Sequence, residues 1–480
     1  MAKKFYITTT LPYVNSDPHI GFALELIQAD VIARFKRSQG YDVFFNTGTD
    51  EHGIKILRKA QEMGMDPKSY SDVYAPKFNN LKVALNVSYN NFIRTTDQHH
   101  IEAAQEFWRL CQKNGDIYKK NYKVKYCVGC ELEKTDSELE NNKCPVHPNL
   151  EIEIIQEENY FFKYSDYQEK LLDFYKKNKN FVIPEGRFNE IVEFTKRGLQ
   201  DFSISRLKEK MPWGVPVPGD DKHVMYVWTD ALVSYISALN WPTDKKKFRD
   251  FWPGIQVAGK DNLRQQSSIW QAMLMSAVLS NSKQIFIHGF ITVSGQKMSK
   301  SLGNVINPFE LVKKYGTDAV RYYLLREILP TEDGDFTYEK FETRYNADLA
   351  GGIGNLVSRT ISLARKNNFK ELKPSLKIKK ATIKTKKESQ KYLEEFKFND
   401  SLKSIWELIS FCDKYINEEK PWEGNNNSSK VISDILHALH EISSLIYPFL
   451  PETAEKVKTA LETKKSEALF PRVLTLHPKD

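Results

Sequence analysis

The chain has 480 residues, which is enough for about three domains, and 41% of them are hydrophobic, which suffices for ordinary buried cores. Charged residues make up 28% of the chain, the mean hydropathy is −0.52, and no apolar run approaches the roughly 20 residues that span a bilayer. These values exclude an integral membrane protein, and we expect a soluble protein with no membrane partner.

The cysteine count and the N-terminus both predict a cytoplasmic protein. Five cysteines, an odd number, argue against a disulfide framework and for a reducing compartment. The first residues enter a predicted strand at once, without the apolar core of a signal peptide or the Arg-rich pattern of a transit peptide. The net charge of +8 permits a polyanionic partner but does not require one.

The first predicted strand, KKFYITTTLPY, covers residues 3–13 and leads through a short loop into a predicted amphipathic helix. We expect Asp17 to cap this helix and Pro18 to occupy its first turn. A helix N-terminus after a strand presents free N–H groups to an anion, with Gly21 allowing close approach and His19 supplying a directed donor. Taken alone, His-x-Gly is more often a surface histidine in a first helical turn.

Strand-like and helix-like segments alternate as far as about Leu110, which is typical of an α/β sheet. Residues 114–221 differ in composition from the alternating segments before them, with two Cys-containing turns and many Lys and Glu. We interpret them as an insertion. The alternation resumes after them, and beyond about Tyr315 the apolar spacing becomes helical throughout. We therefore expect an interrupted α/β domain followed by a helical bundle.

Two tight pairs of metal-binding residue types lie in the insertion. Cys127-Val-Gly-Cys130 is followed by Cys144-Pro-Val-His147, so that each turn presents two ligands, as tetrahedral Zn²⁺ requires. Four protein ligands leave no open position, so this predicts one structural zinc ion rather than a catalytic one. Cys111 and Cys412 lie outside the pattern and are interpreted as packing residues.

Two cationic segments follow. The run SGQKMSKSLGN, after a strand ending near Val293, places Lys297 and Lys300 among small polar residues, a composition suited to a loop that closes over a phosphate chain. Alone, such a loop is more often merely solvated. The segment from Lys373 to Lys391 is strongly cationic, and a solvated linker or helix face explains it at least as well as an RNA contact.

Considered together, His-Ile-Gly after the first strand and Lys-Met-Ser-Lys-Ser after a late strand resemble the paired signature motifs of class I aminoacyl-tRNA synthetases. Further segments are similar to the methionyl-tRNA synthetase family, over a stretch from Phe5 to about Pro451. These segments are TGTDEHG (47–53), YVWTDAL (226–232), GKD (259–261), YGTDAVRYYLL (315–325) and NLVSR (355–359).

The resemblance implies a fold and a division into domains. The expected fold is an α/β Rossmann-type catalytic domain with an inserted zinc-knuckle connective domain, followed by an all-α C-terminal anticodon-binding bundle. The expected domains are the first catalytic half (1–113), the connective insertion (114–222), the second catalytic half with the KMSKS loop (223–314), a stem-contact linker (315–345) and the anticodon-binding domain (346–480).

The resemblance also implies an activity, that of a methionine–tRNA ligase. Such an enzyme joins L-methionine to ATP, giving methionyl-adenylate and pyrophosphate, and then transfers the methionyl group to the 3′ end of tRNA(Met) for translation initiation and elongation. Mg²⁺ would accompany ATP. By the same resemblance the catalytic residues are His19, Lys297 and Lys300, and the ATP-binding residues are these three with Gly21, Asp261 and Ser299.

The implied substrate sites are a methionine pocket and an anticodon surface. Apolar and aromatic walls suit a thioether, because sulfur–aromatic contacts are favourable. The pocket residues are Leu11, Tyr13, Asp50, Trp228, Ala231, Tyr235, Gln266 and Trp270, with Asp50 holding the substrate ammonium. Asn355, Arg359 and Trp422 would contact anticodon bases, whereas without the family pattern Trp422 could equally be a core residue at a helix end.

The chain departs from the family pattern at three positions. Phe22 stands where the family has a second histidine, Asn262 where isoleucine is usual, and Gln266 where histidine is usual. Two alternatives therefore stay open: another class I synthetase, or a non-catalytic tRNA-binding paralogue. Longer relatives append a dimerising domain after the bundle, so we expect a monomer.

Overall fold

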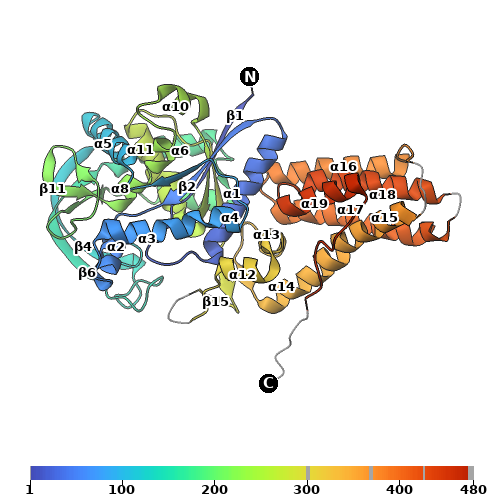
Figure 1. Ribbon diagram of the computed structural model, residues 1–480. Helices are drawn as coiled ribbons and strands as arrows, with labels where there is room; N and C mark the ends of the chain where they lie inside the picture. Colours follow the sequence, from blue (N-terminus) through green and yellow to red (C-terminus); the bar gives the residue numbers. More distant parts are fainter. Residues whose placement is uncertain (1, 299–302, 367–370, 425–426, 474–480) are drawn as a thin grey trace. The chain divides into compact units, whose positions relative to one another are not determined.

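The computed structural model describes residues 2–298, 303–366, 371–424 and 427–473 (Figure 1). The chain divides into two compact units, each built from separate stretches of sequence. The first unit comprises Met1–Pro18, Tyr41–Asn80 and Tyr89–Ile287, and the second comprises His19–Gly40, Leu81–Ser88 and His288–Asp480.

A six-stranded sheet, in the order β3-β2-β1-β12-β13-β7, organises the first unit. The central strand β1 is aromatic and β-branched, is buried along nearly its whole length, and pairs in parallel with β2 and β12. The strand order therefore reverses at β1, and in such sheets ligands bind beyond the carboxyl ends of the strands at the reversal. The strands are β1 (Lys4–Thr9), β2 (Asp42–Thr49), β3 (Asn91–Arg94), β7 (Val182–Ile183), β12 (Ile255–Gly259) and β13 (Gln284–His288).

One strand of the region predicted as an insertion, residues 114–222, belongs to the six-stranded sheet, because β7 pairs in parallel with β13. The other strands of this region form two antiparallel sheets. One has the order β5-β4-β6-β8 and the other the order β10-β11-β9. The long pair β4 and β6 continues directly into the cysteine-containing turns. The strands are β4 (Ile117–Cys127), β5 (Leu132–Lys134), β6 (Glu153–Phe162), β8 (Phe202–Ser203), β9 (Ser205–Leu207), β10 (Pro216–Val217) and β11 (Asp220–Met225).

Helices cover the six-stranded sheet of the first unit, around an aromatic core that includes Phe107, Trp108 and Trp270. A π-helix at Gln265–Ile269 precedes α11, and such irregular turns are frequent at functional sites. The helices are α2 (Ile54–Glu62), α3 (Pro67–Asn79), α5 (Gln98–Lys113), α6 (Gln168–Lys177), α7 (Glu185–Lys196), α8 (Val227–Ala231), α9 (Ser234–Ser237), α10 (Lys245–Phe251) and α11 (Trp270–Ser276).

The second unit is mainly helical, with one small sheet in the order β15-β14-β16. Its last helices, from α15 to α19, pack on one another as the orange and red bundle of Figure 1, which confirms the predicted C-terminal helical domain. The helices are α1 (Ile20–Ser38), α4 (Leu81–Ala84), α12 (Pro308–Tyr315), α13 (Thr317–Arg326), α14 (Tyr338–Arg344), α15 (Asn355–Lys366), α16 (Leu376–Glu394), α17 (Phe398–Glu419), α18 (Ser428–Ile446) and α19 (Pro451–Thr463). The strands are β14 (Ile291–Val293), β15 (Gln296–Lys297) and β16 (Gly334–Phe336).

A buried ion pair ties α1 to α13 within this second unit. The guanidinium of Arg321 lies 2.8 Å from the Asp30 carboxylate, and neither side chain is exposed. Arg321 also donates to the carbonyls of Phe449 and Pro448, which join the bundle to the same centre. Burial would raise the pKa of Asp30, but the charges of Arg321 and Arg34 bring it below its usual value.

Local details at the start of the chain differ from the prediction. The first strand ends at Thr9, because Pro12 in the predicted extension has no N–H to give to a ladder. Asp17 is not the cap of α1: the chain stays extended through His19, which is the N-cap, and Asp17 instead pairs with Lys77 at 2.7 Å. Pro18 accordingly precedes the helix.

The cationic segment from Lys373 to Lys391 belongs largely to α16, which buries a stripe including Ile378, Thr382 and Leu393. The structure therefore supports the helix-face interpretation over a linker. Among the described residues, no helix combines the length and apolar character needed to cross a bilayer.

Candidate functional site

A group of predicted methionine-pocket residues gathers beyond the carboxyl ends of β1 and β2. Tyr13 and Asp50 form an isolated parallel bridge, and Asp50 N–H donates to the Pro12 carbonyl at 2.9 Å. The ring of Trp228, on α8, meets the ring of Tyr13 edge-on at 6.5 Å. The parallel pairing of β1 with β2 thus brings Tyr13 beside Asp50, and α8 adds Trp228 from a distant part of the chain.

A second group lies on the π-helix and its neighbours. The Gln266 side-chain amide donates to the Tyr235 hydroxyl at 2.5 Å, and the Tyr235 ring meets the Trp270 ring at 6.1 Å. Trp270 is fully buried and also stacks on Phe107 at 5.3 Å, so it belongs to the aromatic core as much as to any pocket. Ala231 is buried on α8.

Several of these residues carry a buried polar atom with no hydrogen-bond partner among the residues that the structure describes. Native proteins seldom leave such atoms unsatisfied, so their concentration in one region indicates a site for a polar ligand. The atoms are Asp50 Oδ1, Trp228 Nε1, Gln266 Oε1 and Trp270 Nε1.

The electrostatics of Asp50 suit a cationic ligand. Burial raises the pKa of Asp50 well above its usual value, and the nearby carboxylates of Asp230 and Glu131 raise it further. An ammonium group placed beside Asp50 would favour its ionised form and would meet a locally acidic environment.

A buried network that sequence reasoning missed supports the Asp50 loop. The Asp230 carboxylate contacts His52 Nδ1 at 2.6 Å and His100 Nε2 at 2.7 Å, and His100 Nδ1 contacts the Ser237 hydroxyl at 2.8 Å. Burial would raise the pKa of Asp230, but these two imidazoles lower it. The signal in the sequence that could have revealed this network is His52, in the family-like segment TGTDEHG, whereas His100 lies in none of the family-like segments.

His19 sits at the mouth of α1 in the second unit. Its Nδ1 accepts the Gly21 N–H at 3.1 Å, and burial lowers the pKa of the imidazole. A neutral ring that accepts at Nδ1 carries its proton on Nε2, which leaves that nitrogen as a donor. The role of His19 as a directed donor to a ligand stays a prediction, with which this geometry is compatible.

The KMSKS segment comes close to the same helix start. A Cβ on Gly21 would lie 3.0 Å from the His19 ring and 3.5 Å from the Met298 side chain. Glycine at this position therefore lets the His19 ring and the Met298 side chain lie close to the backbone of the helix start. Lys297 is exposed on β15, and its ammonium lies 5.6 Å from the Phe290 ring centre. Ser299 and Lys300 lie outside the described residues.

Asp261 and Leu11 belong to the first unit, as do all the predicted methionine-pocket residues, whereas His19, Gly21 and Lys297 belong to the second. Asp261 is exposed just beyond the carboxyl end of β12 and accepts a hydrogen bond from Asn262 at 3.1 Å. Leu11 is partly exposed beyond β1.

The four predicted metal ligands meet at the end of β4. Their ligand atoms all lie within 4.8 Å of one another. Cys130 Sγ lies 3.5 Å from Cys144 Sγ and 3.3 Å from His147 Nδ1, and Cys127 Sγ lies 3.9 Å from the same nitrogen. A tetrahedral zinc ion separates its ligand atoms by about 3.5–3.8 Å, so the cluster could hold a structural metal ion of this kind.

The surroundings of this cluster fit a closed site. A Cβ on Gly129 would lie 2.4 Å from the His147 ring, so only glycine lets the turn close around the ligands. Cys111 and Cys412 are buried elsewhere, and burial raises the pKa of each thiol to about 12. Inert, protonated thiols agree with their interpretation as packing residues.

Asn355, Arg359 and Trp422, predicted to contact RNA bases, line one cavity of about 570 Å³ in the helical bundle. Asn355 and Arg359 share a face of α15, and the Arg359 guanidinium lies 5.0 Å from the Trp422 ring centre. Trp422 is 47% exposed, so it is not the core residue that its place near a helix end allowed. An exposed indole backed by an arginine is suited to stacking on an unpaired base.

Comparison with known proteins agrees with this geometry. A family model described as tRNA synthetases class I (M) matches residues 5–151 and 133–361, and one described as the anticodon-binding domain of tRNA ligase matches residues 377–474. The chain is 43% identical to a methionine–tRNA ligase of Thermotoga maritima, over 97% of this chain and 76% of that protein. It is 40% identical to one of Brucella suis, over 98% of this chain and 94% of the other.

A solved structure shares the fold as well. Mycobacterium tuberculosis methionyl-tRNA synthetase in complex with methionyl-adenylate superposes with a TM-score of 0.91 at 35% identity, over 98% of both chains. Since the family model covers most of the chain and the relatives exceed 30% identity over nearly all of it, the chain belongs to the class I methionyl-tRNA synthetase family.

Proposed function

We propose that this chain is a methionine–tRNA ligase, which forms methionyl-adenylate from L-methionine and ATP and transfers the methionyl group to the 3′ end of tRNA(Met). The observation that carries the proposal is the group formed by Tyr13, Asp50 and Trp228 beyond the strand ends. Asp50 Oδ1 and Trp228 Nε1 in this group are buried and unpaired within the described chain. A relative of the same fold is named as binding methionyl-adenylate.

In the first step the methionine carboxylate attacks the α-phosphorus of ATP and displaces pyrophosphate. Catalysis of such a step consists mainly of positioning and of neutralising the growing negative charge. Asp50 would hold the substrate ammonium, while the neutral His19 ring would donate from Nε2 to the α-phosphate. Lys297 and Lys300 would serve the β- and γ-phosphates, together with the Mg²⁺ ion that accompanies ATP, and Gly21, Asp261 and Ser299 would complete the nucleotide site.

The thioether side chain would lie against the aromatic and apolar groups that share the first unit. Sulfur–aromatic contacts are worth about 0.3–1.5 kcal/mol each, enough to favour methionine over an alkyl side chain of similar size. The pocket residues would be Leu11, Tyr13, Trp228, Ala231, Tyr235, Gln266 and Trp270.

The metal of the knuckle would be a single zinc ion held by Cys127, Cys130, Cys144 and His147. The ligand spacings and the donor set support zinc, and when bound the ion supplies folding energy rather than chemistry, because all four positions are filled by protein.

The second step requires recognition of tRNA(Met). Asn355 and Arg359 would hydrogen-bond to anticodon bases, and Trp422 would stack on one of them, as proteins commonly read unpaired loop bases. We further propose that the chain acts as a cytoplasmic monomer, with the five domains predicted from its sequence.

Three departures from the family pattern bear on this proposal. Phe22 lies in the first turn of α1 and cannot donate a hydrogen bond to a nucleotide, so activation depends on His19 and the lysines. Gln266 replaces a usual histidine and retains a side-chain hydrogen bond to Tyr235. Asn262 lies beside Asp261 and donates to it.

The test is amino-acid-dependent exchange of pyrophosphate into ATP, measured with methionine, cysteine, valine, leucine and isoleucine. Methionine alone should support fast exchange. Exchange driven by another of these amino acids would replace the proposal with a different class I synthetase. No exchange with any of them, together with retained tRNA binding, would favour a non-catalytic paralogue.

A further inference from the structure

One side chain joins the metal knuckle to the methionine pocket. Glu131 follows the ligand Cys130 directly and is fully buried, although it belongs to a loop of the connective insertion. It has a positive φ of 50°, which a residue with a long side chain seldom adopts, and its N–H donates to the Val128 carbonyl at 3.3 Å. The turn that gathers the metal ligands therefore also fixes the direction of the Glu131 side chain.

The Glu131 carboxylate acts at the start of α2, immediately after the Asp50 loop. Gly53 is the N-cap of α2 and has no side chain with which to cap it. Glu131 Oε1 instead accepts the Lys55 N–H at 3.1 Å, and a Cβ on Gly53 would lie 3.2 Å from both carboxylate oxygens. A carboxylate at a helix N-terminus is favourable both as a hydrogen-bond acceptor and as a charge.

The same carboxylate borders the pocket itself. It lies close enough to Tyr13 and Asp50 to raise the pKa of each, although burial is the larger cause for both. Tyr13 is contacted on its ring face by the Lys55 ammonium, 4.5 Å from the ring centre. Glu131 and Lys55 thus both lie beside Tyr13.

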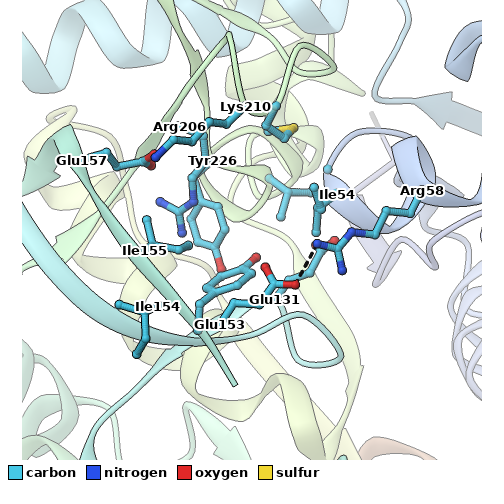
Figure 2. Close-up of a pocket in the computed structure, with 14 residues that line it drawn as sticks. Ile54, Arg58, Glu131, Glu153, Ile154, Ile155, Glu157, Arg206, Lys210 and Tyr226 are labelled. Atoms are coloured by element: carbon cyan, nitrogen blue, oxygen red, sulfur yellow. Dashed lines mark hydrogen bonds and ion pairs between the residues drawn. The ribbon is translucent and has the colours of Figure 1, made fainter. Parts of the chain in front are cut away.

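Glu131 lines a cavity of about 240 Å³ together with Tyr226 and Arg206. Figure 2 shows these three side chains around it. The Glu131 carboxylate is fully buried and lies near the Tyr13 hydroxyl, whose pKa it helps to raise. Buried carboxylates are normally paired with polar groups, and here those groups are the N-terminus of α2 and Tyr13. Packing of the insertion alone would be served equally well by an apolar side chain.

We propose that Glu131 is a positioning residue for the amino-acid pocket: it caps α2 from the metal turn and so sets the Asp50 loop and Tyr13 for methionine. This inference rests on the proposed function, because it assigns Asp50 and Tyr13 to the methionine site. It makes the affinity for methionine depend on the fold of the knuckle through one side chain.

The first experiment measures methionine binding by calorimetry and both Michaelis constants by pyrophosphate exchange, in Glu131→Gln, Glu131→Ala and the control Glu140→Ala. Glu140 lies in the same knuckle and pairs with Lys143 through backbone atoms alone in the described contacts, so its side chain is a matched control. The Kd for methionine should rise about tenfold in Glu131→Ala, the effect of losing a hydrogen bond to a charged group. It should rise less in Glu131→Gln, which keeps an oxygen acceptor for Lys55.

The Michaelis constant for ATP and the metal content should match the wild type in all three variants. A methionine Kd in Glu131→Ala equal to that in Glu140→Ala would overturn the proposal. So would loss of the metal from Glu131→Gln, because Glu131 would then serve the knuckle rather than the pocket.

The second experiment removes the metal by chelation and repeats the calorimetry. Metal removal should weaken methionine binding by about tenfold in the wild type and by much less in Glu131→Ala, since the two perturbations break the same link. Equal weakening in both proteins would contradict coupling through Glu131. A metal-loaded wild type that binds no methionine would instead refute the proposed function itself.

Discussion

Replacement of Trp422 by alanine should separate tRNA charging from amino-acid activation. The indole is 47% exposed and its described contact is with the Arg359 guanidinium at 5.0 Å, so its removal leaves no cavity in the bundle core. Stacking of one base on an aromatic side chain is worth about 1–3 kcal/mol, which corresponds to a rise of roughly 5- to 150-fold in the Michaelis constant for tRNA. The assay is steady-state aminoacylation of tRNA(Met), with pyrophosphate exchange measured in parallel.

Exchange should stay at the wild-type rate in Trp422→Ala, because the residue belongs to the second unit's helical bundle and not to the methionine pocket. The matched control is Ile383→Ala, an exposed apolar residue on α16 outside the cavity, which should leave both assays unchanged. The reasoning would be refuted if Trp422→Ala charged tRNA with an unaltered Michaelis constant, or if it lost exchange and charging together.

Three further outcomes are expected. Cys144→Ser should lose the bound metal, measured by elemental mass spectrometry, and should melt at a lower temperature. The control Cys412→Ser, at a buried cysteine outside the cluster, should keep the metal. Retention of metal by Cys144→Ser would contradict the ligand set. Arg321→Met should lower the free energy of unfolding by about 3–5 kcal/mol in urea titrations, because the buried charge of Asp30 then loses its partner Arg321. A change below about 1 kcal/mol would disprove a stabilising role for this ion pair. Burial and nearby carboxylates raise the pKa of Asp50, so its carboxyl is protonated at low pH and the affinity for methionine should increase as the pH rises through that pKa. Calorimetry across pH should show no such trend in Asp50→Asn. An identical trend in that variant would assign the titration to another group.

The sequence predicted the features that rest on local spacing. The paired turns that begin at Cys127 and Cys144 determine which four side chains can meet. In the structure their ligand atoms all lie within 4.8 Å of one another, close enough to bind one metal ion. The α/β class and the helical C-terminal domain followed from apolar periodicity, and the structure confirms both.

What the sequence missed depends on contacts between distant segments. Nothing in the local pattern distinguishes Glu131 from the other acidic residues of the insertion, and its role emerges only when the knuckle meets the start of α2. His100 was overlooked for the same reason, since its partner Asp230 lies far along the chain. Asp17 was predicted to cap α1 because Asp is a common N-cap, but His19 performs that task with its own ring nitrogen.

A crystal structure of the chain with bound methionine tests the central claim most directly. The account predicts that the methionine ammonium lies within hydrogen-bonding distance of Asp50 Oδ1 and that the thioether lies beside Tyr13 and Trp228. Methionine bound elsewhere, with the Asp50 carboxylate still turned away from any ligand, would contradict the assignment of this site.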